Sequence, residues 1–162
     1  MARHEASPNA AAVSPSGCTA LKLRQIDRAL TRHYDAYVVS TGLKNTQYSL
    51  LSHVLRLGPL RPGDLARAMG LSASTLTRNV QPMVEAGWLS VDAGPDARSR
   101  MVHITEAGRA KRAEAQRHWR AAQESLNALL GTQRVAALHE LIDESTARLR
   151  ATDESTSGDL DD

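Results

Sequence analysis

The stretch GPLRPGDLARAMGLSASTLTRNVQPMVEAGWLSVDAGPDARSRMVHIT, residues 58–105, decides the fold of this 162-residue chain. Its first part predicts a short helix over residues 64–69, a turn over residues 70–72, and a second helix directly after the turn. Gly70 can adopt the left-handed conformation that ends a helix. The Ser72 hydroxyl can accept a hydrogen bond from a free backbone N–H at the start of the second helix. The segment therefore begins as helix, tight turn, helix.

Two short strands are predicted after the second helix, at residues 88–91 and 101–105. A polar loop over residues 92–100 joins them, and its Gly94-Pro95 pair favours a turn. A helix-turn-helix followed by such a hairpin is a winged helix-turn-helix, a shape that places one helix in a DNA major groove. The predicted fold class is thus mainly α with a small β-hairpin wing, flanked by terminal dimerisation helices.

The second helix has an apolar side and a polar side. Leu76, Val80, Met83 and Val84 recur at helical spacing and are expected to face the core, and Pro82 is expected to bend the helix without ending it. The polar side carries short or planar hydrogen-bonding groups, the kind that reach base edges and phosphates. The candidate DNA-binding residues here are Ser72, Ser74, Thr75, Thr77, Arg78 and Asn79.

The loop between the strands supplies a second group of candidates. Arg98 and Arg100 flank Ser99, and a guanidinium suits the narrow, electronegative minor groove. Asp96 could hold the Arg98 side chain by a charge-assisted hydrogen bond. The alternative is a solvated hairpin whose charges only aid solubility; the adjacent helix-turn-helix favours DNA contact.

Composition agrees with a nucleic-acid partner. The formal net charge is only +2, but residues 151–162 hold five acids and no Lys or Arg, which leaves 20 basic against 13 acidic residues in the body. A basic body attracts a polyanion. Length and an apolar fraction of 41% indicate one domain with appendages.

Several function classes find no support in the sequence. It contains no secretory or membrane-spanning pattern, so a cytoplasmic location without membrane contact is expected. The single cysteine, Cys18, excludes an internal disulfide. The histidines show no metal-ligand spacing, and no cofactor or acyl-transfer motif occurs, so neither a metal, a cofactor nor an enzymatic activity is predicted.

A helical frame surrounds the predicted DNA-binding lobe. We expect a disordered tail at residues 1–17, helices for dimerisation and for a pocket at 18–57, the winged lobe at 58–105, further dimerisation helices at 106–150 and a disordered acidic tail at 151–162. Thr105 and Thr132 are expected to cap the last two helices. Apolar faces on terminal helices usually meet a second copy. An isologous homodimer is therefore predicted, with its recognition helices ~34–36 Å apart on a pseudo-palindrome.

The chain resembles the multiple antibiotic resistance regulator (MarR) family of bacterial transcription factors over roughly residues 20–150. The resemblance rests on GLKNTQY (42–48), LA (65–66), LSASTLTR (71–78), EAGWL (85–89), DARS (96–99) and ITEAG (104–108). It implies a dimeric repressor that binds near its own promoter. It also implies release by a small ligand, often a phenolic or aromatic acid, or by cysteine oxidation. Arg98 would then enter the minor groove with Asp96 as its support.

The resemblance also implies an effector cavity between the dimerisation helices and the DNA-binding lobe. The candidate ligand-binding residues are His33, Tyr34, Tyr37, Tyr48 and Leu51, with Arg112 or Arg117 pairing with a ligand carboxylate. The alternative is that the tyrosines are core residues and the arginines are solvated.

Two further alternatives remain open. The peroxide-sensing branch of the family uses one cysteine near the start of the first helix, held by two tyrosines. In this chain Ala20 occupies the position of that cysteine, and Cys18 lies two residues before it. An offset of two residues turns a side chain by about 200° around a helix. Tyr34 matches one of the two tyrosine positions, and Asn45 occupies the other. Alternatively, the winged helix serves protein interaction without DNA contact, in which case an apolar patch is expected in place of the polar helix start.

Overall fold

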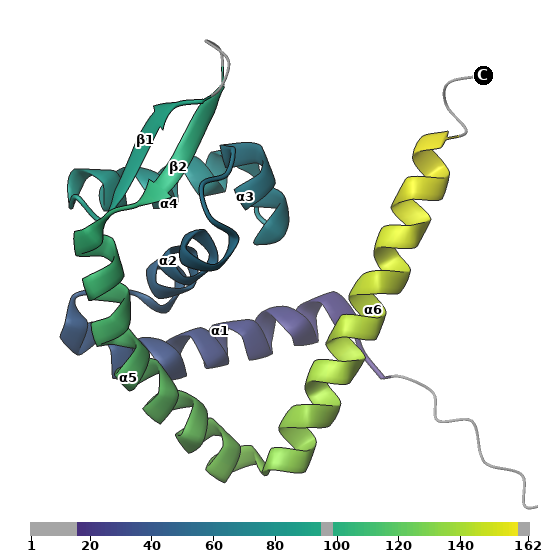
Figure 1. Ribbon diagram of the computed structural model, residues 1–162. Helices are drawn as coiled ribbons and strands as arrows, with labels where there is room; N and C mark the ends of the chain where they lie inside the picture. The colour runs from purple at the N-terminus through teal and green to yellow at the C-terminus, as the bar shows by residue number, and fades with distance from the viewer. Residues whose placement is uncertain (1–15, 95–98, 159–162) are drawn as a thin grey trace, which may run out of the picture.

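The computed structural model describes residues 16–94 and 99–158 and contains six α-helices and a two-stranded hairpin in that part of the chain. The expectations for residues 1–15, Asp96, Arg98 and residues 159–162 lie outside the described residues. The element order is α1 (Thr19–Val38), the short 3-10 helix η1 (Val39–Thr41), α2 (Asn45–Leu57), α3 (Pro62–Ala68), α4 (Ala73–Glu85), β1 (Leu89–Ala93), β2 (Arg100–Ile104), α5 (Glu106–Leu130) and α6 (Thr132–Gly158) (Figure 1). The predicted winged helix-turn-helix with helical flanks is confirmed.

Local signals place the boundaries of the winged lobe. The Ser72 Oγ accepts a hydrogen bond of 3.2 Å from the Thr75 backbone N–H and caps α4. Gly70 takes a φ of +63° between α3 and α4, a conformation that glycine adopts without strain. Pro82 lies within α4, which continues to Glu85. The strands pair in antiparallel register from Leu89 opposite Ile104 to Ala93 opposite Arg100.

One apolar core lies between α2, the helix-turn-helix and the hairpin. Its fully buried side chains come from α2, which precedes the winged lobe, and from every element of the lobe: Leu50, Leu51 and Val54 from α2, Leu65 from α3, Leu76 and Met83 from α4, and Leu89 and Val102 from the strands. The prediction that Val84 joins this core was wrong, because its side chain is 38% exposed. Val84 follows Met83 by about 100° around the helix and faces a hollow instead.

The flanking helices form an open frame (Figure 1). α1 runs beneath the lobe and packs against α5, whereas α6 turns away after Gly131 and projects from the rest of the chain. Val135 is the one buried residue among the α6 side chains that the structure describes. No helix among the described residues is both long and apolar enough to span a membrane.

The structure differs from the expectations at both ends of α6. The helix begins at Thr132 itself, so Thr132 is not its cap. It continues to Gly158, whereas a disordered tail was expected from residue 151. The reason is local: between residues 132 and 158 the sequence has no proline, and its first glycine is Gly158.

Candidate nucleic-acid interface and effector cavity

The first half of α4 presents a polar, exposed surface. Ser72, Ser74, Thr75, Thr77 and Arg78 are exposed, and Asn79 is half-buried. The hydroxyls are linked to one another or to the backbone. The Ser72 Oγ lies 2.8 Å from the Thr75 Oγ1 and 3.2 Å from the Ser74 Oγ, and the Thr77 hydroxyl donates to the Ala73 carbonyl at 2.9 Å. This helix therefore displays an ordered set of donors and acceptors to solvent.

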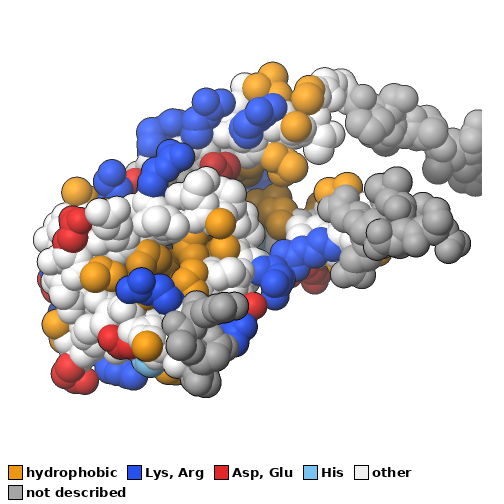
Figure 2. All heavy atoms as spheres, turned by 90° about the horizontal axis from the view of Figure 1, so that it is seen from above, with side chains coloured by type: hydrophobic (Ala, Val, Ile, Leu, Met, Phe, Trp, Pro, Cys, Tyr) orange, Lys and Arg blue, Asp and Glu red, His pale blue; other side chains and the backbone are white. Residues whose placement is uncertain are grey.

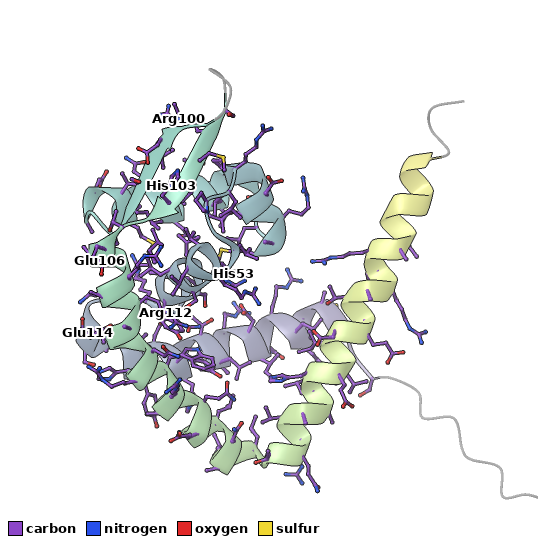
Figure 3. All side chains as sticks on the ribbon, in the orientation of Figure 1. His53, Arg100, His103, Glu106, Arg112 and Glu114 are labelled. Carbon is purple, nitrogen blue, oxygen red and sulfur yellow. The ribbon has the colours of Figure 1, made fainter. Side chains whose placement is uncertain are left out.

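The hairpin adds a cation beyond α4. Arg100 is exposed at the start of β2, at the outer end of the hairpin (Figure 3). The base of the loop is closed by a 2.8 Å hydrogen bond from the Gly94 N–H to the Ser99 carbonyl. Figure 2, which views the molecule from this end, shows Lys and Arg side chains at several places on this face.

An apolar hollow of about 480 Å³ lies between the second half of α4 and the hairpin. Val80 and Val84 line it from α4, and Val91 and Val102 line it from the strands. Figure 2 shows hydrophobic side chains gathered on this face of the lobe. Sequence reasoning missed the hollow, because Val84 was assigned to the core. The hollow lies beside the polar first half of α4, so the start of the helix remains polar and is not an apolar patch.

A second cavity, of about 550 Å³, lies between α2 and α5. It is lined from α2 by Tyr48, Ser49, Ser52, His53, Leu55 and Arg56, and from α5 by Arg112, Gln116 and Trp119. Only two of the predicted ligand-binding residues, Tyr48 and Arg112, are among these. Figure 3 labels His53 on α2 and Arg112 on α5.

The other predicted ligand-binding residues lie elsewhere. Leu51 is fully buried in the core, and Arg117 is exposed on α5. Tyr34 and His33 hold α1 against α5: the Tyr34 hydroxyl donates to the Gln123 Oε1 at 2.6 Å, and the His33 Nε2 lies 3.0 Å from the Ala122 carbonyl oxygen. The Tyr37 ring packs beside His33, with 5.4 Å between ring centroids.

Trp119 lies between the aromatic residues that join α1 to α5 and those that line the cavity. Its ring stacks on Tyr34 with centroids 6.0 Å apart and on Tyr48 with centroids 5.7 Å apart. Tyr48 and Trp119 reach the cavity, while Tyr34 stays within the α1–α5 contact. Burial raises the pKa of the Tyr34 hydroxyl above its ordinary value.

Arg112 is the most distinctive group in the α2–α5 cavity. It is half-buried, and its Nε donates to the Ser52 Oγ at 3.2 Å while a terminal nitrogen donates to the Gln116 Oε1 at 2.5 Å. Its guanidinium carbon lies 5.7 Å from the centre of the Tyr48 ring. Within the described part of the chain it forms no salt bridge, so neutral partners alone hold its charge. A guanidinium beside aromatic rings is a suitable site for an aromatic anion.

The cavity residues that sequence reasoning missed are Ser49, Ser52, His53, Leu55, Arg56, Gln116 and Trp119. Spacing could have found the α2 set, since Ser49, Ser52, His53 and Arg56 recur at i, i+3, i+4 and i+7 and share one helix face. That this face of α2 packs against α5, about 60 residues later in the chain, cannot be predicted from any local sequence pattern.

Cys18 immediately precedes α1, and its thiol is free and exposed. Tyr34 lies sixteen residues further along the same helix, ~24 Å along its axis. A tyrosine pair around this thiol therefore cannot include Tyr34 of the same chain.

The fold and the exposed polar helix together define a winged helix-turn-helix transcriptional regulator. The MarR family model matches residues 41–99. The transcriptional regulator MosR of M. tuberculosis, solved in complex with DNA, is 31% identical with a TM-score of 0.70, covering 81% of this chain and 98% of MosR. The chain belongs to the MarR family, a family of transcriptional regulators and not of enzymes.

Two other proteins are similar to this chain. A mutant MarR from E. coli, complexed with operator DNA, is 20% identical with a TM-score of 0.71, covering 78% of this chain and 91% of that protein, and supports the fold. The uncharacterised HTH-type regulator YwoH of Bacillus subtilis is 24% identical over 90 residues, 56% of this chain and 66% of YwoH. The chain thus spans about two thirds of that relative.

Proposed function

We propose that the protein is a homodimeric repressor that binds a pseudo-palindromic operator near its own promoter and leaves the DNA when an aromatic acid occupies the α2–α5 cavity. One observation carries the proposal. Arg112 on α5 is half-buried, has no acidic partner among the described residues, and donates to Ser52 of α2, the helix that also packs on α4. A candidate anion site thus lies one helix away from the polar surface of α4.

The DNA-binding part of the proposal rests on α4 and the hairpin. Ser74, Thr75 and Arg78 are exposed near the start of α4, where a recognition helix contacts base edges. Arg100, and Arg98 outside the described residues, would extend contact into the minor groove. The structure of MosR in complex with DNA supports DNA binding by this chain.

The dimer is supported by α6. Its large apolar side chains Leu141 and Leu149 are 62% and 67% exposed, and Leu129 at the end of α5 is 73% exposed. A long helix with an uncovered apolar face gains most of its stability from packing, which a single chain does not supply here. A second copy, packed through α1, α5 and α6, would cover these residues and set two recognition helices about one DNA turn apart.

The regulatory part of the proposal rests on α5. This helix supplies Arg112 and Trp119 to the cavity, and its first turn packs on the corner that follows α4. A ligand that shifts Arg112 would therefore shift the helix that supports α4. In a dimer this would change the spacing of the two recognition helices.

The test is fluorescence anisotropy of the protein on its own upstream DNA, with and without a panel of aromatic carboxylic acids. We expect tight, salt-sensitive binding that one or more acids release. The Arg112→Gln variant should bind the DNA equally well but resist release, and Arg117→Gln, an exposed arginine of the same helix, should behave like the wild type. Tight binding that no acid releases would transfer the regulatory role to Cys18 oxidation or another ligand. No binding even at low salt would favour the protein-interaction alternative.

A further inference from the structure

The α2–α5 cavity collects three groups that can carry positive charge and, among the described residues, no acidic one. His53 and Arg56 line it from α2, and Arg112 lines it from α5; its remaining lining residues are neutral. The elements α1, α3, α4 and β2, which also pack on α2, contribute no described residue to the lining. The charged neighbours of His53 in the cavity are thus the two arginines, and the site is suited to more than one negative charge.

The lining residues are ordered along α2. Tyr48, stacked on Trp119, makes an aromatic wall, and Arg112 reaches over the Tyr48 ring to Ser52. His53 is adjacent to Ser52, and Arg56 lies one turn further on. A ring that lies against the aromatic wall with one acidic group on Arg112 leaves His53 and Arg56 available to a second acidic group.

The hydrogen bonding of His53 determines which nitrogen is available. The Nδ1 lies 2.8 Å from the Ser49 carbonyl oxygen, which accepts only, so the Nδ1 carries a proton and donates. The Nε2 has no described partner, and it becomes a charged donor when the imidazole is protonated.

We propose that the cavity binds aromatic ligands with two acidic groups in preference to ligands with one, and that His53 and Arg56 form the second anion contact. This inference rests on the proposed role of the cavity as the effector site. It assigns the specificity to residues outside the Arg112 contact.

The experiment is isothermal titration calorimetry of the full chain with benzoate and with the three benzene dicarboxylates, phthalate, isophthalate and terephthalate. We expect at least one dicarboxylate to bind about ten-fold or more tighter than benzoate, because a charge-assisted contact is added. In His53→Gln and in Arg56→Gln the affinity for the dicarboxylate should fall by a larger factor than the affinity for benzoate. His103→Gln, the same substitution outside the cavity, should retain the preference.

The outcomes separate this inference from the proposed function. Equal affinity for benzoate and all three dicarboxylates, with binding lost in Arg112→Gln, overturns the second contact and leaves the effector cavity in place. A dicarboxylate preference that persists in both His53→Gln and Arg56→Gln also overturns it. No binding of any of the four acids contradicts the effector cavity itself. Because Arg56 is exposed, its variant tests the inference even where His53→Gln fails to fold.

Discussion

Gly108, in the first turn of α5, packs directly against the backbone carbonyl of Trp88, and a Cβ at this position would overlap that oxygen. Two hydrogen bonds strengthen the same junction. The Thr105 N–H donates to the Trp88 carbonyl at 3.1 Å, and the Thr105 hydroxyl donates to the Gly87 carbonyl at 2.7 Å. The start of α5 is therefore joined to the corner that immediately follows α4. Arg112 lies one helical turn beyond Gly108, so the junction connects the α2–α5 cavity with the end of α4.

Gly108→Ala is expected to destabilise the protein by about 1–3 kcal/mol, because the added methyl meets backbone and the junction must shift. Urea unfolding would measure the loss. The matched control is Gly63→Ala in α3, where a Cβ meets nothing within 4 Å. That variant should be neutral or slightly stabilising. An equal effect of the two substitutions would contradict the proposed close contact.

Thr105→Ala removes both the cap of α5 and the bond to Gly87, since the hydroxyl accepts from the Gly108 N–H at 3.0 Å and donates to the Gly87 carbonyl. We expect a loss of about 1–2 kcal/mol in the free energy of unfolding. Thr105→Ser retains the hydroxyl and should recover most of it. Thermal unfolding of both variants under one condition separates the contribution of the Thr105 hydroxyl to stability from that of its methyl group.

Arg78→Ala should weaken operator binding by about 1–3 kcal/mol, because the side chain is exposed near the start of α4. Anisotropy titrations at several salt concentrations measure both the affinity and its salt dependence. Arg148→Ala on α6, where the arginine pairs with Glu144 at 2.6 Å, changes charge equally and should leave DNA affinity unchanged. Unaltered binding by Arg78→Ala would remove this residue from the interface.

Leu141→Lys on α6 should convert a dimer to a monomer, since it places a charge on an apolar face that we assign to the second copy. Light scattering after size-exclusion chromatography gives the mass directly. Glu140→Lys, the neighbouring exposed residue, alters charge without removing an apolar side chain and should remain dimeric. A wild type that is monomeric at micromolar concentration would refute the dimer.

Tyr34→Phe tests the α1–α5 contact. The loss of the hydrogen bond to Gln123 should cost about 0.5–1.5 kcal/mol at neutral pH. Burial raises the pKa of this hydroxyl, so the folded state holds the proton more strongly than the unfolded state above about pH 10. The contribution of the Tyr34 hydroxyl to the free energy of unfolding is therefore fully present below pH ~10 and decreases as the pH rises through the pKa of the folded state. The stability difference between wild type and Tyr34→Phe should therefore narrow at high pH, as measured by urea unfolding.

The winged lobe could be predicted because its signals are local. Gly70, Ser72 and Thr105 each act on backbone within a few residues, and the apolar spacing of α4 identified Leu76, Val80 and Met83 as buried. The prediction that Val84 is buried in the core was wrong because Val84 lies at the edge of the apolar stripe. There, spacing alone does not distinguish a residue of the core from one that lines a surface hollow. The predicted end of the last helix was wrong. The acidic composition from residue 151 suggested disorder, but that stretch contains no helix-breaking residue before Gly158.

The α2–α5 cavity could be predicted only in part. The resemblance to the family indicated a cavity and an arginine, and Arg112 and Tyr48 do line one. His33, Tyr34 and Tyr37 of the first helix were predicted to bind the ligand, but His33 and Tyr34 bond α1 to α5, and the Tyr37 ring packs beside His33.

The sequence by itself determined the helix-turn-helix, the hairpin, the polar start of α4 and the family, since each depends on short-range spacing, capping and turn chemistry. Only the tertiary structure decided which faces of α2 and α5 meet, that Trp119 stacks between the Tyr34 and Tyr48 contacts, and that Gly108 rests on Trp88. The physical reason is that these relationships depend on how helices pack across long sequence separations. Packing of that kind is set by the fit of whole surfaces, which no local pattern encodes.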